Sequence, residues 1–567
     1  MGPETRNCRN CKQDFTIESD DFSFYEKIDV PAPTHCPQCR MVRRFFFRNE
    51  RAWYKRTCAA TGKSILSMYS PDLPLVVYDD AYWKSDAWDA LSYGVDFDFS
   101  RPFFEQFGEL FNTVPHPNLI QKNNVNSTYT HYTSDDKNCY FCASAVNCED
   151  SSYLFSMVDR VKNSLDVHIS SDSEYCYELI DSTKCNRVAF AQNCEACVES
   201  TFLYDCRNCT NCFGCVGQRN AQYMVFNQQY SKDEYQKIIS EYRSGGYAAL
   251  QSAKEAFDEL KLSFPHKYAM IINAQNVIGD EISNSRNCLQ CFSVRSNVEN
   301  CKYSYRVWNN TKDGWDGFII WSGSEMFYET VSATSQRVYF SAYIWGGNDI
   351  EYSYNCFDCA NCFGCVGLRS KTYCIFNKQY SKDEYHELVS KIKEAMRASG
   401  EYGEFFPVSV SPFAYNETIN QDYFPISKEE ALAAGYKWRD PEEKHYSITV
   451  PTEAIPDSIT DVTDDMTKEV IACAHGGLCS DQCATAFRIT ADELQFYRTM
   501  KLPLPRLCPN CRHFGRVKMK TPLQLWHRAC MCTQENHDHE GVCSNEFETA
   551  YSPERSEIVY CESCYQK

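Results

Sequence analysis

Paired cysteines with a fixed separation stand near both ends of this 567-residue chain. In each place one closely spaced pair is followed, after 24 residues, by a Cys-x2-Cys pair. The eight residues are Cys8, Cys11, Cys36 and Cys39 in the first copy, and Cys479, Cys483, Cys508 and Cys511 in the second. Cys473 lies close to the second copy and could exchange with Cys479. Two pairs of thiols on tight turns can place four thiolates in a tetrahedron, the geometry that zinc prefers. The spacing therefore predicts a zinc-ribbon or treble-clef module at each end, with a closed, structural metal site.

The two end modules each extend into a second, similar unit. Cys58 and Cys530 both lie 19 residues after the preceding Cys-x2-Cys pair, and Tyr-Ser-Pro follows in both copies. The C-terminal copy then adds a further Cys-x2-Cys pair, whereas the N-terminal copy has aspartate and tyrosine there. A third site is therefore predicted from Cys530, Cys532, Cys561 and Cys564. His537, His539 and Cys543 lie in an insertion of the C-terminal copy, as an exposed polar loop or as alternative ligands.

A second duplication, with an offset of 150 residues, occupies the middle of the chain. The run Cys-x2-Cys-x2-Cys-x2-Cys at residues 206–215 recurs at 356–365, and Tyr-Ser-Lys-Asp-Glu-Tyr follows each run. Serine and glutamate three residues apart form a capping box, so we expect helices from about Lys232 toward Tyr242 and from Lys382 to Arg397. Before each helix, short units rich in Tyr, Val, Phe and Cys follow at nearly constant spacing. This texture predicts a parallel β-solenoid, or failing that a sandwich.

The whole chain is therefore predicted to be mainly β with a few helices. Terminal zinc-ribbon or treble-clef modules flank two duplicated halves that resemble a parallel β-solenoid, and each half ends in a helix. The predicted parts are 1–115 (N-terminal module with a degenerate second unit), 116–262 and 263–400 (the two halves), 401–468 (an irregular, solvated connector) and 469–567 (C-terminal double module).

The four-cysteine runs have two interpretations. Their spacing is close to the bacterial ferredoxin run, but it differs at the last interval and lacks the proline that follows there. Cysteine is also small and apolar enough to fill the interior ladders of a solenoid. We prefer interior thiols to an iron–sulfur cluster, so the expected cofactor is Zn²⁺ in about three structural sites.

Basic residues cluster after the second cysteine pair of the N-terminal module, interleaved with phenylalanine, tryptophan and tyrosine. They are Arg40, Arg43, Arg44, Arg48, Arg51, Lys55 and Arg56. Arginine forks beside aromatic rings suit phosphate contact and base stacking, so this cluster is a candidate nucleic-acid surface. Alternatively, the arginines pair with some of the chain's own 76 acidic residues.

Composition limits the function classes. The net charge of −19 argues against a surface that coats nucleic acid, so any such contact would be local. The first residues contain no apolar signal stretch, and no apolar run is long enough to span a membrane. Cysteine pairs in such a chain indicate metal sites in a reducing cytoplasm rather than extracellular disulfides. No P-loop, GxSxG or HExxH motif is present, so an enzyme is the less favoured class.

Several motifs resemble a group of uncharacterised zinc-ribbon proteins predicted in small-genome bacteria of the candidate phyla. They are Cys-Pro-Gln-Cys-Arg at residues 36–40, Asn-Cys-Phe-Gly-Cys-Val-Gly-x-Arg at Asn211 and Asn361, and Tyr-Ser-Pro-Glu-Arg from Tyr551 with Val-Tyr-Cys-Glu-Ser-Cys-Tyr from Val559. The resemblance implies zinc binding and no particular activity. We expect a non-enzymatic binding or scaffold protein with a protein or RNA partner. The alternatives are an RNA- or ribosome-associated protein that uses its arginine-rich tips, or an iron–sulfur or carbohydrate-active enzyme.

Overall fold

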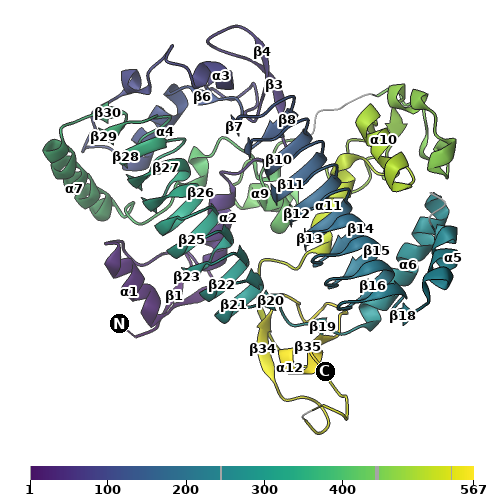
Figure 1. The fold of residues 1–567 in the computed structure, drawn as a ribbon. Helices are drawn as coiled ribbons and strands as arrows, with labels where there is room; N and C mark the ends of the chain where they lie inside the picture. Colours follow the sequence, from purple (N-terminus) through teal and green to yellow (C-terminus); the bar gives the residue numbers. More distant parts are fainter. Residues whose placement is uncertain (1, 243–245, 441–445, 538) are drawn as a thin grey trace.

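Two long stacks of parallel strands form the middle of the molecule. The computed structural model describes residues 2–242, 246–440, 446–537 and 539–567. Figure 1 shows strands β10 to β16 in blue in one stack and β21 to β28 in teal in the other. We call them solenoid 1 (residues 121–229) and solenoid 2 (residues 271–379). The predicted mainly-β class and parallel, solenoid-like stacking are confirmed.

The strands follow one another in chain order along each stack, and all but the last pair are parallel. Solenoid 1 contains β7 (Gln121–Lys122), β8 (Thr128–His131), β9 (Thr133–Ser134), β10 (Tyr140–Val146), β11 (Ser152–Asp159), β12 (Leu165–Ser171), β13 (Tyr177–Thr183), β14 (Asn186–Gln192), β15 (Val198–Tyr204), β16 (Thr210–Val216), β17 (Gln222–Val225) and β18 (Gln228–Gln229). Solenoid 2 contains β20 (Ile271–Ile272), β21 (Gln275–Ser283), β22 (Arg286–Arg295), β23 (Glu299–Lys302), β24 (Tyr305–Trp308), β25 (Lys312–Ile320), β26 (Glu325–Tyr339), β27 (Ala342–Glu351), β28 (Phe357–Phe363), β29 (Thr372–Ile375) and β30 (Lys378–Gln379).

The sequence period of these stacks is three rather than two. Cys139, Cys142, Ala145 and Cys148 are at most 1% exposed and share one apolar cluster. One coil takes twelve residues in most of solenoid 1, since Val198 pairs with Thr210 in the next coil. Each coil therefore sends four side chains inward. The Cys-x2-Cys-x2-Cys-x2-Cys runs fill all four inward positions of one coil.

Residues that precede the inward positions adopt left-handed backbone conformations. Asn138, Phe141 and Asn147 have φ of 53°, 54° and 56°. Such conformations cost about 1–2 kcal/mol for most residues, and asparagine and aspartate tolerate them best. Stacked amides offset part of this cost: Asn138 donates to the Asp150 carboxylate of the next coil at 2.8 Å.

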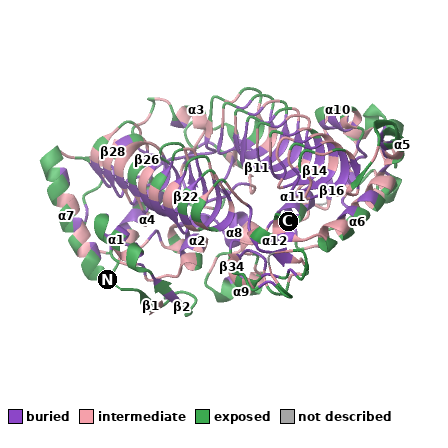
Figure 2. Ribbon diagram, turned by 60° about the horizontal axis from the view of Figure 1, so that its bottom comes forward, coloured by how far each residue is buried: buried purple, intermediate pink, exposed green. Residues whose placement is uncertain are grey.

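Four helices belong to the duplicated halves. Two were predicted, α5 (Lys232–Tyr242) and α7 (Lys382–Ser399), and the capping box at Ser381 is present. Two were not, α4 (Phe103–Thr113) and α6 (Tyr247–Ser263). Helix α4 packs on the end of solenoid 2, where Phe103 contacts Tyr352, and α6 packs on the end of solenoid 1, where Phe257 contacts Phe202. In Figure 2 the strands of both stacks are mostly buried, whereas α5 and α7 expose their outer faces.

The end modules consist of four similar units, which we call N1, N2, C1 and C2. N1 contains β1 (Glu4–Asn7), β2 (Asp14–Ile17), α1 (Ser19–Lys27) and α2 (Pro37–Phe45); N2 contains β3 (Tyr54–Thr57), β4 (Ser64–Ser67), β5 (Val77–Tyr78) and α3 (Asp80–Trp83). C1 contains β31 (Ile471–Ala472), β32 (Ala486–Phe487), α10 (Ala491–Met500) and α11 (Pro509–Met519); C2 contains β33 (Trp526–Ala529), β34 (Glu546–Thr549), β35 (Val559–Tyr560) and α12 (Glu562–Tyr565).

The two modules pack crosswise on the solenoids. Helix α2 of N1 contacts β25 and β26 of solenoid 2, and α11 of C1 contacts β12 of solenoid 1. Strand β5 of N2 pairs with β6 (His116–Pro117), which leads into solenoid 1, and β35 of C2 pairs with β19 (His266–Lys267), which leads into solenoid 2. The molecule is therefore built from two equivalent halves. Half A contains N1, N2, α4, solenoid 2 and α7, and half B contains C1, C2, α6, solenoid 1 and α5.

The predicted connector, 401–468, is not one solvated stretch. Tyr402, Phe405 and Phe406 are at most 3% exposed, and short elements follow: η2 (Val408–Val410), η3 (Tyr415–Glu417), α8 (Asn420–Tyr423) and α9 (Lys428–Ala433). The aromatic side chains of this segment explain its burial, since each buries a large apolar surface. Residues 441–445 lie outside the described residues. Beyond them, η4 (Thr452–Ala454), η5 (Ile459–Asp461) and η6 (Asp464–Lys468) form short turns, and Ile455, Ile459 and Val462 are buried.

Candidate metal centres

Three four-thiol groups lie in units N1, C1 and C2. They are Cys8, Cys11, Cys36 and Cys39; Cys473, Cys483, Cys508 and Cys511; and Cys530, Cys543, Cys561 and Cys564, with all sulfur atoms of a group within 4.8 Å of one another. Measured pairs are 3.8 Å in N1 (Cys11 to Cys36), 3.5 Å in C1 (Cys508 to Cys511) and 4.0 Å in C2 (Cys543 to Cys561). Four sulfurs about 2.3 Å from zinc in a tetrahedron would lie about 3.8 Å apart. The three groups therefore fit a zinc-sized ion.

One backbone hydrogen bond recurs in all units and organises each group. The first cysteine of the last pair caps the following helix, and its backbone N–H donates to the sulfur of the first cysteine of the unit. The donor–sulfur pairs are Cys36 to Cys8 at 3.3 Å, Cys508 to Cys473 at 3.2 Å and Cys561 to Cys530 at 3.2 Å. In N2, Asp79 donates to Cys58 in the same way at 3.2 Å. N2 therefore keeps the fold of the unit with a single thiol.

Hydrogen bonds favour the thiolate, which is the form that binds metal, at single sulfurs of these groups. A hydrogen bond from Cys36 and a second from Asn10 lower the pKa of Cys39 to about 5. In C2, burial opposes ionisation of Cys561, but hydrogen bonds from Asn545 and Ser563 lower its pKa to about 6.

The structure differs from the sequence prediction at one ligand in each C-terminal unit. In C1, Cys473 takes the place predicted for Cys479, because it is Cys473 that receives the recurrent backbone hydrogen bond. In C2, Cys543 from the inserted loop takes the place predicted for Cys532. Because of the insertion, the thiol that joins Cys530 in the group is Cys543, further along the chain, and not the nearby Cys532.

The two predicted ligands that are not in a four-thiol group, Cys479 and Cys532, each lie in a second cluster of potential metal ligands beside it, which we call the neighbouring group. Cys532 lies with His537, His539 and Cys564, and Cys479 lies with His475, Asp481 and Cys511. Each neighbouring group thus shares one cysteine with the four-thiol group beside it. In C1, Asp481 is already paired with Lys518 at 2.5 Å.

The thiols of the solenoid runs donate hydrogen bonds to backbone carbonyls. Cys206 donates to Tyr204 at 3.5 Å and to Cys215 of the next coil at 3.4 Å, and Cys176 and Cys365 make the same pair of bonds. Burial raises the pKa of Cys176, an interior thiol outside the two runs, to about 12. Among the described residues, no thiol of residues 206–215 or 356–365 belongs to a group with metal-binding proximity. These geometries fit protonated interior thiols.

The predicted nucleic-acid surface is mostly interior. Arg40 and Arg44 are at most 1% exposed, and both contact Asp316 of β25 at 3.0 Å. Arg44 also contacts Glu329 of β26 at 2.8 Å, as does Arg43. Burial opposes ionisation of Glu329, yet the three guanidinium groups lower its pKa. These three arginines therefore pair with the chain's own carboxylates, which was the alternative interpretation of the sequence.

The remaining members of the cluster have separate surroundings. Arg48 pairs with Glu50 at 2.9 Å, Arg51 donates to Asn510 of C1 at 2.6 Å, and Arg56 donates to the carbonyl of Ser70 at 2.6 Å. Burial lowers the pKa of Arg51 to about 10. Lys55 is exposed. A phosphate-binding surface would need several of these groups at the surface, so the cluster does not form one.

Half B repeats this anchor with equivalent residues. Arg512 and Arg516, which lie 472 residues after Arg40 and Arg44, contact Asp166 of β12 at 2.8 and 2.9 Å. Arg516 also contacts Glu178 of β13 at 2.9 Å. The carboxylates were not singled out from the sequence. Their positions in the repeat, with Asp166 and Asp316 150 residues apart, are the signal that could have found them.

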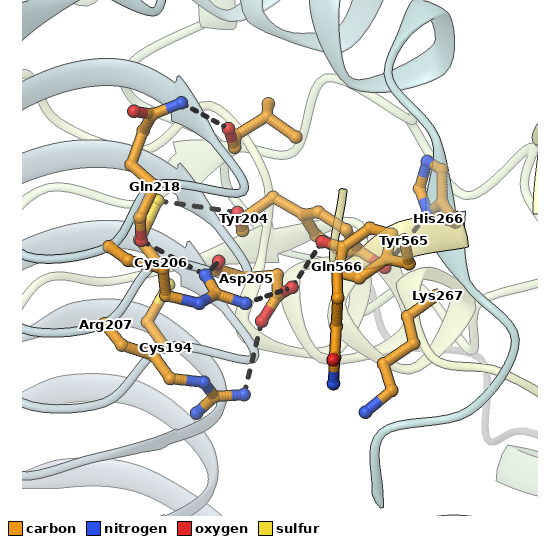
Figure 3. Close-up of polar contacts among 12 residues, drawn as sticks. Cys194, Tyr204, Asp205, Cys206, Arg207, Gln218, His266, Lys267, Tyr565 and Gln566 are labelled. Carbon is orange, nitrogen blue, oxygen red and sulfur yellow. Dashed lines mark hydrogen bonds and ion pairs between the residues drawn. The ribbon is translucent and has the colours of Figure 1, made fainter. Parts of the chain in front are cut away.

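Unit C2 is joined to solenoid 1 by a buried carboxylate (Figure 3). Asp205, 1% exposed, pairs with Arg219 at 2.7 Å and Arg207 at 3.2 Å, and accepts a hydrogen bond from Tyr565 of α12 at 2.5 Å. Nearby, His266 contacts Tyr204 at 3.0 Å and the carbonyl of Lys261 at 2.9 Å. These contacts fix the helix that starts at the third four-thiol group.

Comparisons with known proteins give no family. No protein-family model and no curated protein matches the chain. A crystal structure of a "putative acetyltransferase from Desulfovibrio desulfuricans G20" is 10% identical, covers 47% of this chain and 69% of its own, and has a TM-score of 0.12. A TM-score this low shows no similarity of the two folds. Among the described helices, none has the length and hydropathy of a membrane span.

Proposed function

We propose that this protein is a zinc-dependent, non-enzymatic scaffold that binds a macromolecular partner. Zinc in the three four-thiol groups would hold the starts of α2, α11 and α12. Those helices carry the side chains that anchor the end modules to the solenoids. The metal would thereby hold each end module on the solenoid of its own half.

The observation that carries this proposal is the burial of the anchoring arginines. Arg44 and Arg516 are each at most 1% exposed and are held by carboxylates from the solenoid strands. Charges at such depth are stable only with their partners in place. The zinc groups lie one turn away, since Cys39 precedes Arg40 and Cys511 precedes Arg512. Loss of metal would therefore loosen the anchor.

An RNA-associated role receives less support, because the arginines that suggested it face carboxylates inside the molecule. An enzymatic role on the solenoids receives no support from any described cluster of catalytic groups. Thiolate ligands require reduced cysteines, and all 34 are free here, so we place the protein in a reducing compartment such as the cytoplasm.

Hydrogen–deuterium exchange before and after zinc removal tests the proposal. Chelation with a strong zinc chelator should remove protection from α2, α11 and α12 first, while β13 to β16 stay protected because their ladders do not depend on metal. Readdition of zinc should restore protection. Equal exchange with and without zinc in all three helices would reject the proposal.

A further inference from the structure

In half A, a short segment after α7 fills the space between the N-terminal module and solenoid 2. Residues 402–406, here called the plug, follow α7 and are buried except for the half-buried Glu404. The Phe406 ring stacks on Phe107 of α4 with centroids 4.6 Å apart, and Phe405 packs on Phe47 at 5.4 Å. Tyr402 packs against rings of solenoid 2. The plug therefore seals the space between N1, α4 and solenoid 2.

In half B, no segment of the described residues fills the same space. A cavity of about 360 Å³ lies between C1, α6 and solenoid 1. The ring-bearing partners of the plug, Phe47, Phe107, Phe340 and Tyr352, correspond through the two repeats to Met519, Phe257, Phe190 and Phe202, and all four line this cavity. Residues 252–256, which lie 150 positions before the plug, are part of α6, the counterpart of α4. Half B therefore retains apolar residues at the positions that surround the plug in half A, but its described residues include no plug.

The polar residues that contact the plug in half A are replaced in half B, but one positively charged side chain is present in both halves. In half A, Glu404 of the plug is held by Arg43 at 2.7 Å and Thr34 at 2.5 Å. In half B the counterpart of Arg43 is Gly515 and that of Thr34 is Arg506, and both line the cavity. Nη1 of Arg506 is buried without a hydrogen-bond partner among the described residues. A carboxylate is the group that this nitrogen would take.

We infer that the cavity of half B is a docking groove for an extended, aromatic and acidic peptide of another protein, resembling the plug in chemistry. This inference rests on the proposed role as a binding scaffold and names its partner class. Aromatic side chains of the partner would enter between Met519 and Phe257. An acidic residue of the partner would pair with Arg506. The backbone of the partner would run where residues 402–406 run in half A.

The plug's own sequence supplies the probe. A fluorescent peptide of residues 401–407, Glu-Tyr-Gly-Glu-Phe-Phe-Pro, should bind the zinc-loaded full chain saturably in an anisotropy titration. A peptide with alanine at the three aromatic positions should lose at least about tenfold in affinity, because those rings supply the buried area. Glutamine in place of the second glutamate should weaken binding less, by removing the charge that faces Arg506.

Two glycine variants locate the binding. Gly515 lies on α11, and an added Cβ there meets no atom within 4 Å, so Gly515→Leu fills the groove without strain. Gly108 of α4 has the same open surroundings outside the groove, so Gly108→Leu is its matched control. Leucine favours a helix over glycine by about 0.5–1 kcal/mol, so both variants should fold. Peptide binding should fall at least about tenfold in Gly515→Leu alone.

Three results would overturn the inference. They are absent peptide binding, equal binding by Gly515→Leu and the parent chain, and a small apolar molecule found in the groove by mass spectrometry of the denatured protein. Peptide binding and metal-dependent exchange are separate readouts. A chain that binds the peptide but shows no metal-dependent exchange would reject the scaffold role and leave the groove standing.

A second observation, independent of the groove, concerns the neighbouring group in C2. The ligand atoms of Cys532, His537, His539 and Cys564 lie within 4.8 Å of one another, and Nδ1 of His537 is 3.1 Å from the Cys532 sulfur. Nδ1 of His539 contacts the carbonyl of Gly541 at 3.0 Å, while its Nε2 is buried without a partner among the described residues. A backbone carbonyl on one ring nitrogen is the usual support of a metal-binding histidine.

We propose that this group holds a further zinc-class ion and that Cys564 bridges it to the ion of the third four-thiol group. Metal analysis of His537→Ala/His539→Ala should show one equivalent less than the parent chain. His527→Ala is the control, since His527 is exposed and belongs to neither group. Unchanged metal content in the double variant would reject the site. In the intact chain loaded with cadmium-113, two mutually coupled resonances are expected across the shared sulfur, and their absence would equally reject it.

Discussion

At the scale of single residues, buried charges carry the anchors between modules and solenoids. Asp316 and Asp166 each receive two guanidinium groups, and all of these side chains are at most 4% exposed. Removing one partner of a buried pair leaves an uncompensated charge, which costs about 3–5 kcal/mol. By contrast, exposed pairs contribute at most about 1 kcal/mol.

Arg44→Met and Arg516→Met should therefore each lower the free energy of unfolding by about 3–5 kcal/mol. The control is Arg337→Met, because Arg337 pairs with Asp349 in the open. Urea unfolding followed by fluorescence gives the three values. Losses below about 1 kcal/mol in both buried variants would show that the anchors are not structural.

Buried histidines make stability depend on pH. Burial lowers the pKa of His266 from 6.5 to about 4, because the imidazolium is disfavoured there. Below pH 6.5 the unfolded chain takes up a proton that the folded chain refuses, so this residue lowers stability as pH falls toward 4. It contributes nothing to the pH dependence above that window.

His266→Gln should accordingly flatten the loss of stability between pH 6.5 and 4, by up to about 1.4 kcal/mol per pH unit. The measurement is a series of urea unfolding curves at several pH values, with His527→Gln as the exposed control. An unchanged slope in His266→Gln would contradict the assignment of a neutral, buried imidazole.

At the scale of elements, the three-residue period defines the solenoids. Asn138 occupies a left-handed corner with φ of 53° and its amide stacks on the next coil. Valine is a poor residue for such a conformation, whereas glycine adopts it freely.

Asn138→Val should destabilise the chain by about 1–2 kcal/mol beyond Asn138→Gly, since both lose the amide ladder but only valine adds backbone strain. Thermal unfolding of the two variants gives the difference. Equal stability of the two would mean that the corner is not left-handed in solution.

The same period explains what the sequence could and could not predict. The solenoid class, α5 and α7 followed from repeats and a capping box. Interior thiols were predicted for residues 206–215, but the inward placement of all four in one coil was not, because a two-residue strand period assigns alternate residues to opposite faces. Cys479 and Cys532 were predicted as ligands in place of Cys473 and Cys543 for a related reason: spacing alone does not show which thiol of a unit joins the four-thiol group. Helix α4 was missed because its apolar face lies against rings from solenoid 2, more than 200 residues away in sequence.

At the scale of the whole molecule, two equivalent halves are joined crosswise, and three units retain four thiols. The long-range pairing of α2 with solenoid 2 could not be read from the sequence. The contact of Arg44 with Asp316 and Glu329 depends on where the folded coils place these two carboxylates. Half B differs from half A in its open groove, which makes it the half expected to meet a partner.

The central claim is that zinc in thiolate groups holds this architecture together. Elemental analysis of the purified full chain, with an absorbance spectrum of the same sample, tests it most directly. The account predicts at least three zinc ions per chain, no iron, and no absorbance in the visible region. Fewer than three zinc ions, or iron with labile sulfide and a brown colour, would contradict it.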